Sequence, residues 1–139
     1  MESDAKNVVA RYYAEAWNTG LVDRFDDFFA ADFVDHNGFP DQRPGVDEVK
    51  RAYVAFRAAF PDLHLRSTVD DMIAEGDKVI VRTTLRATHR GTFRGTPATG
   101  NPIEVEGISI FRVAGGKLVE RRGLTDGLGL LRQLGAEVR

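Results

Sequence analysis

The sequence predicts an α+β fold in which N-terminal helices pack against a strongly curved, mostly antiparallel sheet. Apolar residues recur at helical spacing up to Phe60, and they alternate at strand spacing after Asp62. Helices followed by a run of strands are typical of α+β domains. A bent sheet with helices on one face has the shape of a cone, and its apolar interior is the expected ligand-binding cavity.

The N-terminal part of the chain carries three helical segments. Residues 5–19 place apolar side chains on one face, and residues 21–29 form a second, shorter helix with phenylalanines turned inward. A short extended piece at 33–36 follows. A third helix is expected at 46–60, and it ends at Pro61 because the residue before a proline disfavours the helical conformation.

Strand-like alternation begins after the third helix. Residues 64–74 and 78–87 read as two strands joined by a tight turn at 75–77. A long strand is expected at 102–113. Its Gly107 indicates a bend or a bulge, because glycine inside a strand often marks such a site.

The C-terminal part of the chain reads as a hairpin followed by a helix. Gly115-Gly116 is a strong two-residue turn signal, and the return strand is expected at 117–125. A final short helix is expected at 128–134. Successive strands joined in this way form an antiparallel meander.

Length, charge and cysteine content limit the classes of protein to consider. A chain of 139 residues is expected to form one domain. Its net charge of −2, with acids and bases interspersed, argues against binding to nucleic acid. The absence of cysteine excludes disulfides and thiolate chemistry. No apolar run reaches the roughly 20 residues that span a bilayer, and the N-terminus lacks a signal-peptide pattern, so a cytoplasmic location without membrane contact is expected.

Three segments carry motifs that point to a known family. They are FVDHNGFP at 33–40, THRGTFRGTPATGNPIEVEGISIFRVAGGKLVE at 88–120 and TDGLGLLRQLG at 125–135. Together with the order of elements, they resemble the SnoaL-like polyketide cyclases of the nuclear-transport-factor-2-like superfamily. The resemblance implies that residues 1–139 form a single SnoaL-like domain with a cystatin-like α+β barrel.

The resemblance also implies an activity and a partner. Cyclases of this family close a ring in a polyketide ester by intramolecular aldol condensation, without a metal, a Schiff base or an organic cofactor. They are commonly homodimers through the sheet. One aspartate is their acid–base residue, and Asp126 is the matching position here. The chain departs from the family pattern at Arg121 and Arg122, because many relatives carry an aromatic residue after the hairpin glutamate.

Asp126 has two possible roles that the sequence leaves open. An aspartate before a short helix can cap the helix N-terminus. A carboxylate in an apolar pocket can instead shuttle protons, because burial raises its pKa toward neutrality. Helix N-terminal amides would oppose that rise. Asp126 is therefore predicted to be a cap, an acid–base group, or both.

Two histidines are candidate substrate contacts. His36 follows a strand-like segment and can hold a substrate carbonyl at the cavity mouth, or it can bond to its own loop. His89 lies in a glycine-rich loop, at the pocket rim or on the surface. The three histidines, His36, His64 and His89, lie too far apart in the sequence to indicate a metal site, so no metal is expected.

Three further residues are candidate ligand contacts. Tyr12 and Trp17 lie on a broad aromatic face of the first helix, where aromatic residues usually belong to the core but can also present a hydrogen-bond donor to a cavity. Arg112 shares a strand with apolar neighbours. If it points inward it can pair with Asp126 or bind a carboxyl group, and otherwise it belongs to an exposed salt bridge.

The leading functional hypothesis is a protein that binds an apolar, carbonyl-bearing small molecule and performs cofactor-free acid–base chemistry, such as aldol cyclisation or isomerisation. One alternative is a non-catalytic binding or dimerisation module with the same fold. Another is an epoxide-hydrolase-like enzyme, which needs two acids bridged by an arginine. Arg112 with Asp126 offers part of that arrangement.

Overall fold

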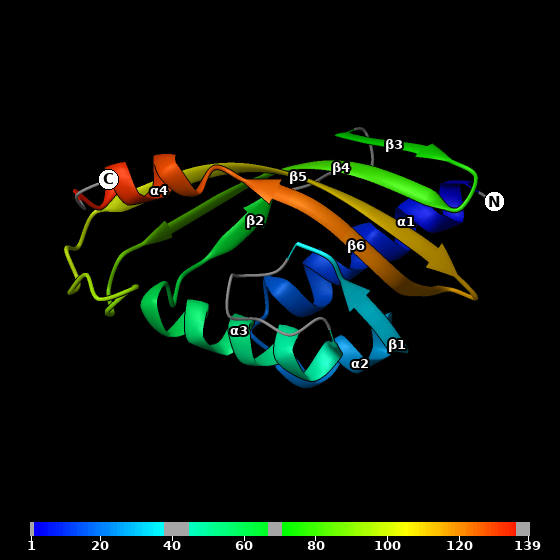
Figure 1. The fold of residues 1–139 in the computed structure, drawn as a ribbon, viewed down its shortest axis with the longest axis horizontal. Helices are drawn as coiled ribbons and strands as arrows, with labels where there is room; N and C mark the ends of the chain where they lie inside the picture. Colours follow the sequence, from blue (N-terminus) through cyan, green and yellow to red (C-terminus); the bar gives the residue numbers. More distant parts are fainter. Residues whose placement is uncertain (1, 38–44, 67–70, 136–139) are drawn as a thin grey trace.

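The computed structural model describes residues 2–37, 45–66 and 71–135. It confirms the α+β class, with a curved sheet that arches over the N-terminal helices (Figure 1). The strands of the six-stranded sheet are β1 (Phe29–Asp35), β2 (His64–Arg66), β3 (Met72–Glu75), β4 (Lys78–Thr88), β5 (Pro102–Ala114) and β6 (Lys117–Thr125). Their order is β1-β6-β5-β4-β2, and β3 also pairs with β4. All pairs are antiparallel except β1 with β6.

The helices lie on the concave side of the sheet, apart from α4 at its far end (Figure 1). They are α1 (Glu2–Tyr12), α2 (Phe25–Phe28), α3 (Val46–Ala59) and α4 (Gly127–Gln133), with a wider π-helical turn η1 (Tyr13–Trp17) after α1 and a 3₁₀ turn η2 (Val22–Arg24) before α2. Alternation along β4 and β5 sends every second side chain into the core, including the fully buried Val79 and Val81. The core therefore lies between the inner sheet face and these helices.

The helix predicted at 21–29 is confirmed up to Phe28 and is wrong only at its last residue. The segment contains the short η2 and α2, and the chain is already extended at Phe29, where β1 begins. Phe29 pairs in parallel with Leu118 of β6. Sheet pairing therefore overrides the helical spacing of the three phenylalanines, of which Phe25 and Phe28 stay on the helix and point into the core.

Two strand predictions also need correction. The continuous strand expected at 64–74 is divided into β2 and β3, which both pair with β4, and residues 67–70 lie outside the described part of the chain. Gly107 is not a bulge, since it pairs regularly with Thr83 on one side and Thr125 on the other. The irregularity lies between Arg112 and Val113. A Cβ atom at position 107 would lie 3.3 Å from the Leu124 carbonyl oxygen, so close packing explains this glycine.

Helix α4 closes the end of β5 beyond the last residue paired with β6. The Gln133 side chain accepts a hydrogen bond from the Glu104 backbone N–H at 2.7 Å and donates one to the Glu104 carbonyl at 2.9 Å. The Asp126 backbone N–H donates to the Glu106 carbonyl at 3.0 Å. A side-chain amide thus takes the place of a neighbouring strand at this point, which satisfies both backbone groups of Glu104.

Within the described ranges, no helix combines the length and the apolar character needed to cross a bilayer.

Candidate functional site

A cavity of about 680 Å³ lies between the concave face of the sheet and the helices. Its walls are mainly apolar and aromatic. The aromatic residues that line it are Tyr12, Tyr13, Trp17, Phe29, Phe33, Tyr53, Phe56, Phe93 and Phe111. A cavity of this size and composition suits a ring-containing small molecule, because ligand sites are mostly apolar and contain a few polar groups that fix orientation.

A buried ion pair stands in this aromatic wall. Arg121 of β6 donates from Nη1 to Asp35 Oδ1 at 3.1 Å, and the Asp35 and Arg121 side chains are 8% and 22% exposed. The two residues face each other because Asp35 and Arg121 are in register between β1 and β6. Asp35 is the sole carboxylate among the described residues that line the cavity.

Ser109 and Tyr13 extend this pair into a polar network. Arg121 Nε donates to Ser109 Oγ at 3.1 Å, and Ser109 lies within hydrogen-bonding reach of the Tyr13 hydroxyl. Burial raises the pKa of Tyr13 to about 12, although Arg121 and Ser109 partly offset that effect. The Tyr13 phenol therefore remains protonated at neutral pH and can act as a hydrogen-bond donor.

His36 lies at the cavity wall and belongs to a second polar group. Its Nε2 is 2.8 Å from Glu120, whose carboxylate also accepts a hydrogen bond from Arg112. Hydrogen bonds from Arg112 and His36 lower the pKa of Glu120 to about 2. A carboxylate bound to an imidazole fixes the orientation of the ring. His36 thus lies at the cavity wall with its imidazole bound to Glu120, and its contact with a substrate stays a prediction.

We expect Glu120→Gln to weaken the acid sensitivity of the fold. The folded-state pKa of Glu120 lies below its ordinary value of 4.5. The stability that this carboxylate contributes is therefore complete above pH 4.5 and is lost as the pH falls toward 2. Thermal unfolding followed by circular dichroism between those pH values should show a smaller fall in Tm for the variant than for the wild type. Equal pH dependence in the two proteins would contradict the assignment.

Asp126 caps helix α4. Its Oδ1 accepts a hydrogen bond from the Gly129 backbone N–H at 2.8 Å, and the residue is exposed. The expectation of a carboxylate inside an apolar hollow is wrong for its placement, because the capping bond holds the side chain at the start of α4. Its chain neighbours Thr125 and Gly127 line the cavity. The structure therefore establishes the cap and leaves the acid–base role as a prediction.

His89 is not at the cavity rim. It is fully buried, and its Nδ1 accepts a hydrogen bond from the Thr99 backbone N–H at 3.2 Å, while its ring lies against Phe60. Backbone bonds from His89 to Asn101 and from Gly100 back to His89 close the loop around it. This closure draws the imidazole into the core, so the predicted surface position is wrong.

Tyr12 and Trp17 both line the cavity and also pack against the core. Both side chains thus lie on the inner side of the N-terminal helical segment, as expected. Arg112 does not line the cavity. Arg112 faces away because even-numbered positions of β5 point to the outer side of the sheet, where it pairs with Glu120 and Asp77. It forms no pair with Asp126, so the partial support for an epoxide-hydrolase-like site disappears.

Comparison with known proteins decides the family. The model of the SnoaL-like polyketide cyclase family matches residues 7–134. The chain is 31% identical over 133 residues to aklanonic acid methyl ester cyclase DnrD from Streptomyces peucetius, covering 91% of this chain and 88% of DnrD. It is also 31% identical to aklanonic acid methyl ester cyclase DauD from Streptomyces sp. strain C5, covering 91% of this chain and 80% of DauD.

The chain belongs to the SnoaL-like polyketide cyclase family. Solved structures agree with this assignment. TsrD from Streptomyces laurentii superposes with a TM-score of 0.86 at 28% identity, covering 99% of this chain and 98% of TsrD. Wild-type IdmH from Streptomyces antibioticus superposes with a TM-score of 0.81 at 30% identity, covering 95% of this chain and 99% of IdmH.

Sequence reasoning missed the polar centre of this SnoaL-like cavity. Asp35 and Ser109 were not among the predicted contacts, and Arg121 was noted only as a departure from the family pattern. Strand alternation is a signal that would have found Arg121. It shares the inner face of β6 with Gly123 and Thr125, opposite the outward Arg122.

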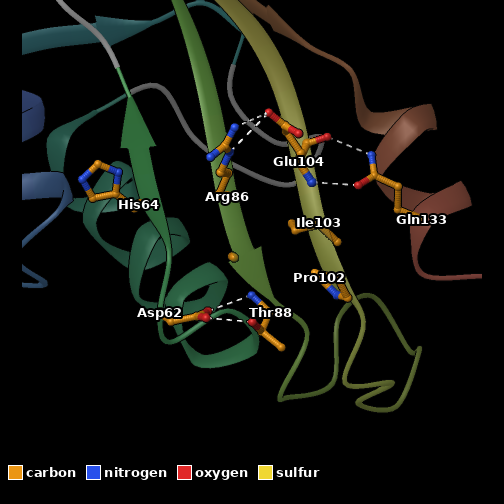
Figure 2. Close-up of a pocket in the computed structure, with 9 residues that line it drawn as sticks. Asp62, His64, Arg86, Thr88, Pro102, Ile103, Glu104 and Gln133 are labelled. Carbon is orange, nitrogen blue, oxygen red and sulfur yellow. Dashed lines mark hydrogen bonds and ion pairs between the residues drawn. The ribbon is translucent and has the colours of Figure 1, made fainter.

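A second, open hollow of about 490 Å³ lies on the outer side of the sheet (Figure 2). Its polar groups already bind one another. Asp62 accepts hydrogen bonds from Thr88, and Arg86 pairs with Glu104, whose backbone is held by Gln133. The inner cavity is therefore the candidate functional site of this SnoaL-like domain. Across the described residues, no group of three His, Asp or Glu side chains is arranged to hold a metal ion.

Proposed function

We propose that this SnoaL-like chain is a cofactor-independent cyclase that closes a ring in an apolar, carbonyl-bearing polyketide ester. The observation that carries the proposal is the aromatic cavity of about 680 Å³ with polar groups on one side. The curated relatives DnrD and DauD are named as aklanonic acid methyl ester cyclases, which supports an ester of this class as substrate.

The proposed reaction is an intramolecular aldol condensation. A base removes a proton from a carbon beside a carbonyl, and the resulting enolate carbon attacks a second carbonyl carbon to form the ring bond. The alkoxide formed on that carbonyl then takes up a proton. The ring closure needs no external oxidant, reductant or group donor. The protein therefore has to hold the substrate in a bent conformation and to move protons.

Asp126 is the proposed acid–base residue, because it matches the family position and its neighbours Thr125 and Gly127 line the cavity. To reach the substrate, its carboxylate must release the Gly129 N–H that it now accepts. His36 is the proposed polar contact for a substrate carbonyl, since it lines the cavity and is oriented by Glu120.

The test uses aklanonic acid methyl ester and two variants. Asp126→Asn should reduce kcat by about 10²–10⁴-fold, the usual contribution of a general acid–base group, and should keep the wild-type Tm because asparagine caps helices equally well. His36→Gln should mainly raise KM. If Asp126→Asn keeps full turnover and His36→Gln loses it, the acid–base role of Asp126 is refuted. A wild-type protein that binds the ester without converting it would refute the cyclase proposal in favour of a binding module.

We also propose that the functional unit is a homodimer formed through the outer face of the sheet. Exposed apolar side chains cross four strands on that face, namely Ile73, Ile80, Ile108, Ile110 and Leu124. Exposed Arg82 and Glu106 border this patch with opposite charges. A second copy related by a twofold axis can cover the same patch and pair these charges, as in isologous interfaces.

Ile108→Asp should therefore shift the protein from dimer to monomer, measured by size-exclusion chromatography with light scattering. The change places a charge at the centre of the apolar patch, where it must be desolvated on association. Lys78→Ala, on the same face outside the patch, is the control and should leave the mass unchanged. A wild-type protein that is monomeric at all tested concentrations rules out the dimer.

A further inference from the structure

The charged network inside the cavity has no role in the proton transfers described above. Arg121 and Asp35 both line the cavity, and both side chains are largely buried. A structural ion pair alone is a weak explanation, because apolar residues of similar volume usually stabilise a buried position at least as well. The position of this pair in the wall of a ligand cavity instead indicates a binding role.

The strand holds the Arg121 guanidinium in a fixed place. Nε binds Ser109 and Nη1 binds Asp35, which fixes the plane of the group. Nη2 lies over Gly123, since a Cβ atom there would be 2.6 Å from Nη2. Gly123 also lines the cavity. No partner of Nη2 is found among residues 2–37, 45–66 and 71–135, so this nitrogen retains donor capacity for a ligand.

The groups around Arg121 Nη2 favour the binding of a negatively charged oxygen. An arginine stays protonated throughout the accessible pH range. The Tyr13 hydroxyl, linked through Ser109, is a second protonated donor on the same side of the cavity. The cavity walls are mainly aromatic, and fixed donors in apolar surroundings stabilise developing charge more than they do in water.

We propose that Arg121 is an oxyanion-binding residue, whose Nη2 donates to the oxygen that becomes negative when a bound carbonyl compound forms its enolate, and that Asp35 is a positioning residue for Arg121. This inference rests on the proposed function and names the group that stabilises its intermediate. Arg121 transfers no proton. Its positive charge stabilises the negative charge that appears on the carbonyl oxygen after a base has removed the proton from the adjacent carbon.

The experiment measures ionisation of a bound dye instead of turnover. Alizarin, a three-ring hydroxyanthraquinone, changes colour when its phenol ionises, and it carries the carbonyl and phenol oxygens of the substrate class. In the wild type, bound alizarin should ionise about 1–3 pH units below free alizarin, as expected for a cation within contact distance. In the double variant with Asp35→Asn and Arg121→Met this shift should disappear, while the neutral dye still binds.

Two further variants separate binding from structure. Asp35→Asn alone leaves the Arg121 charge without its counterion, so the shift should increase, whereas a purely structural pair predicts equal loss of affinity for both dye forms. Gly123→Ala should reduce the shift without any change in charge, because its Cβ displaces Nη2. Arg122→Met, the outward neighbour on β6, is the matched control and should leave the shift unchanged.

The other titratable groups at the cavity need one more control. The lining also contains His36, Arg94, Tyr12, Tyr13 and Tyr53. Arg94→Met removes the other arginine of the lining, which is exposed, and should preserve the shift. An unchanged shift in the double variant, or a wild type that does not bind alizarin or does not shift its ionisation, overturns the proposal. Because alizarin is not converted, this result is independent of whether the chain cyclises an ester.

Discussion

Arg121→Met is expected to lower the free energy of unfolding by about 3 kcal/mol. The change removes the guanidinium that contacts Asp35, whose side chain is 8% exposed. Breaking a buried ion pair by removing one partner typically costs about 3–5 kcal/mol, and the 22% exposure of Arg121 places the expected value at the lower end. Urea unfolding at pH 7 measures this change in the free energy of unfolding.

The companion variants make this expectation specific. Adding Asp35→Asn to Arg121→Met should recover most of the lost stability, because the buried carboxylate that has lost Arg121 is then removed as well. Arg122→Met, on the outer face of the same strand, should change the free energy of unfolding by less than about 0.5 kcal/mol. If both arginine variants lose the same stability, the effect does not arise from the ion pair.

Phe25→Ala is expected to cost about 3–5 kcal/mol, the usual range for removing a buried phenylalanine ring. Phe25 is fully buried, and its ring centroid lies 5.5 Å from that of Tyr12, 5.8 Å from Phe29 and 4.9 Å from Tyr53. These contacts join α2 to α1, β1 and α3. The three partner residues line the cavity, so the ring supports the wall from behind.

Leu21→Ala provides the control for Phe25→Ala. Leu21 lies a few residues earlier and is 57% exposed, so its truncation should stay within about 0.5 kcal/mol of the wild type. Phe25→Ala should also weaken binding of alizarin, because Tyr12, Phe29 and Tyr53 lose their common support. A Phe25→Ala protein with wild-type stability would show that the helical layer does not depend on this ring.

Local patterns were enough to predict most of the secondary structure. The third helix, expected at 46–60, is α3, and the strand expected at 117–125 is β6. The failures occur where pairing over a long distance in the sequence decides the outcome. Phe29 joins β6 across the molecule, which its neighbours in the sequence do not indicate.

The site was harder to predict than the fold for the same reason. His36, Tyr12 and Trp17 were placed correctly at the cavity by helix spacing and strand ends. Asp35 and Arg121 become partners only through the parallel register of β1 and β6, and single-sequence periodicity contains no information on that register. Asp126 is exposed, and its side chain accepts the capping hydrogen bond from Gly129. The family pattern had instead suggested a position inside the pocket.

The bond between Gln133 and the backbone of Glu104 bears on how this protein avoids aggregation. A strand with open N–H and C=O groups is a template to which a strand of another molecule can add, and such addition can propagate into fibrils. The amide of Gln133 occupies those groups on β5 beyond the end of β6. The last turn of α4 thus blocks the addition of a strand from another molecule at this point of β5.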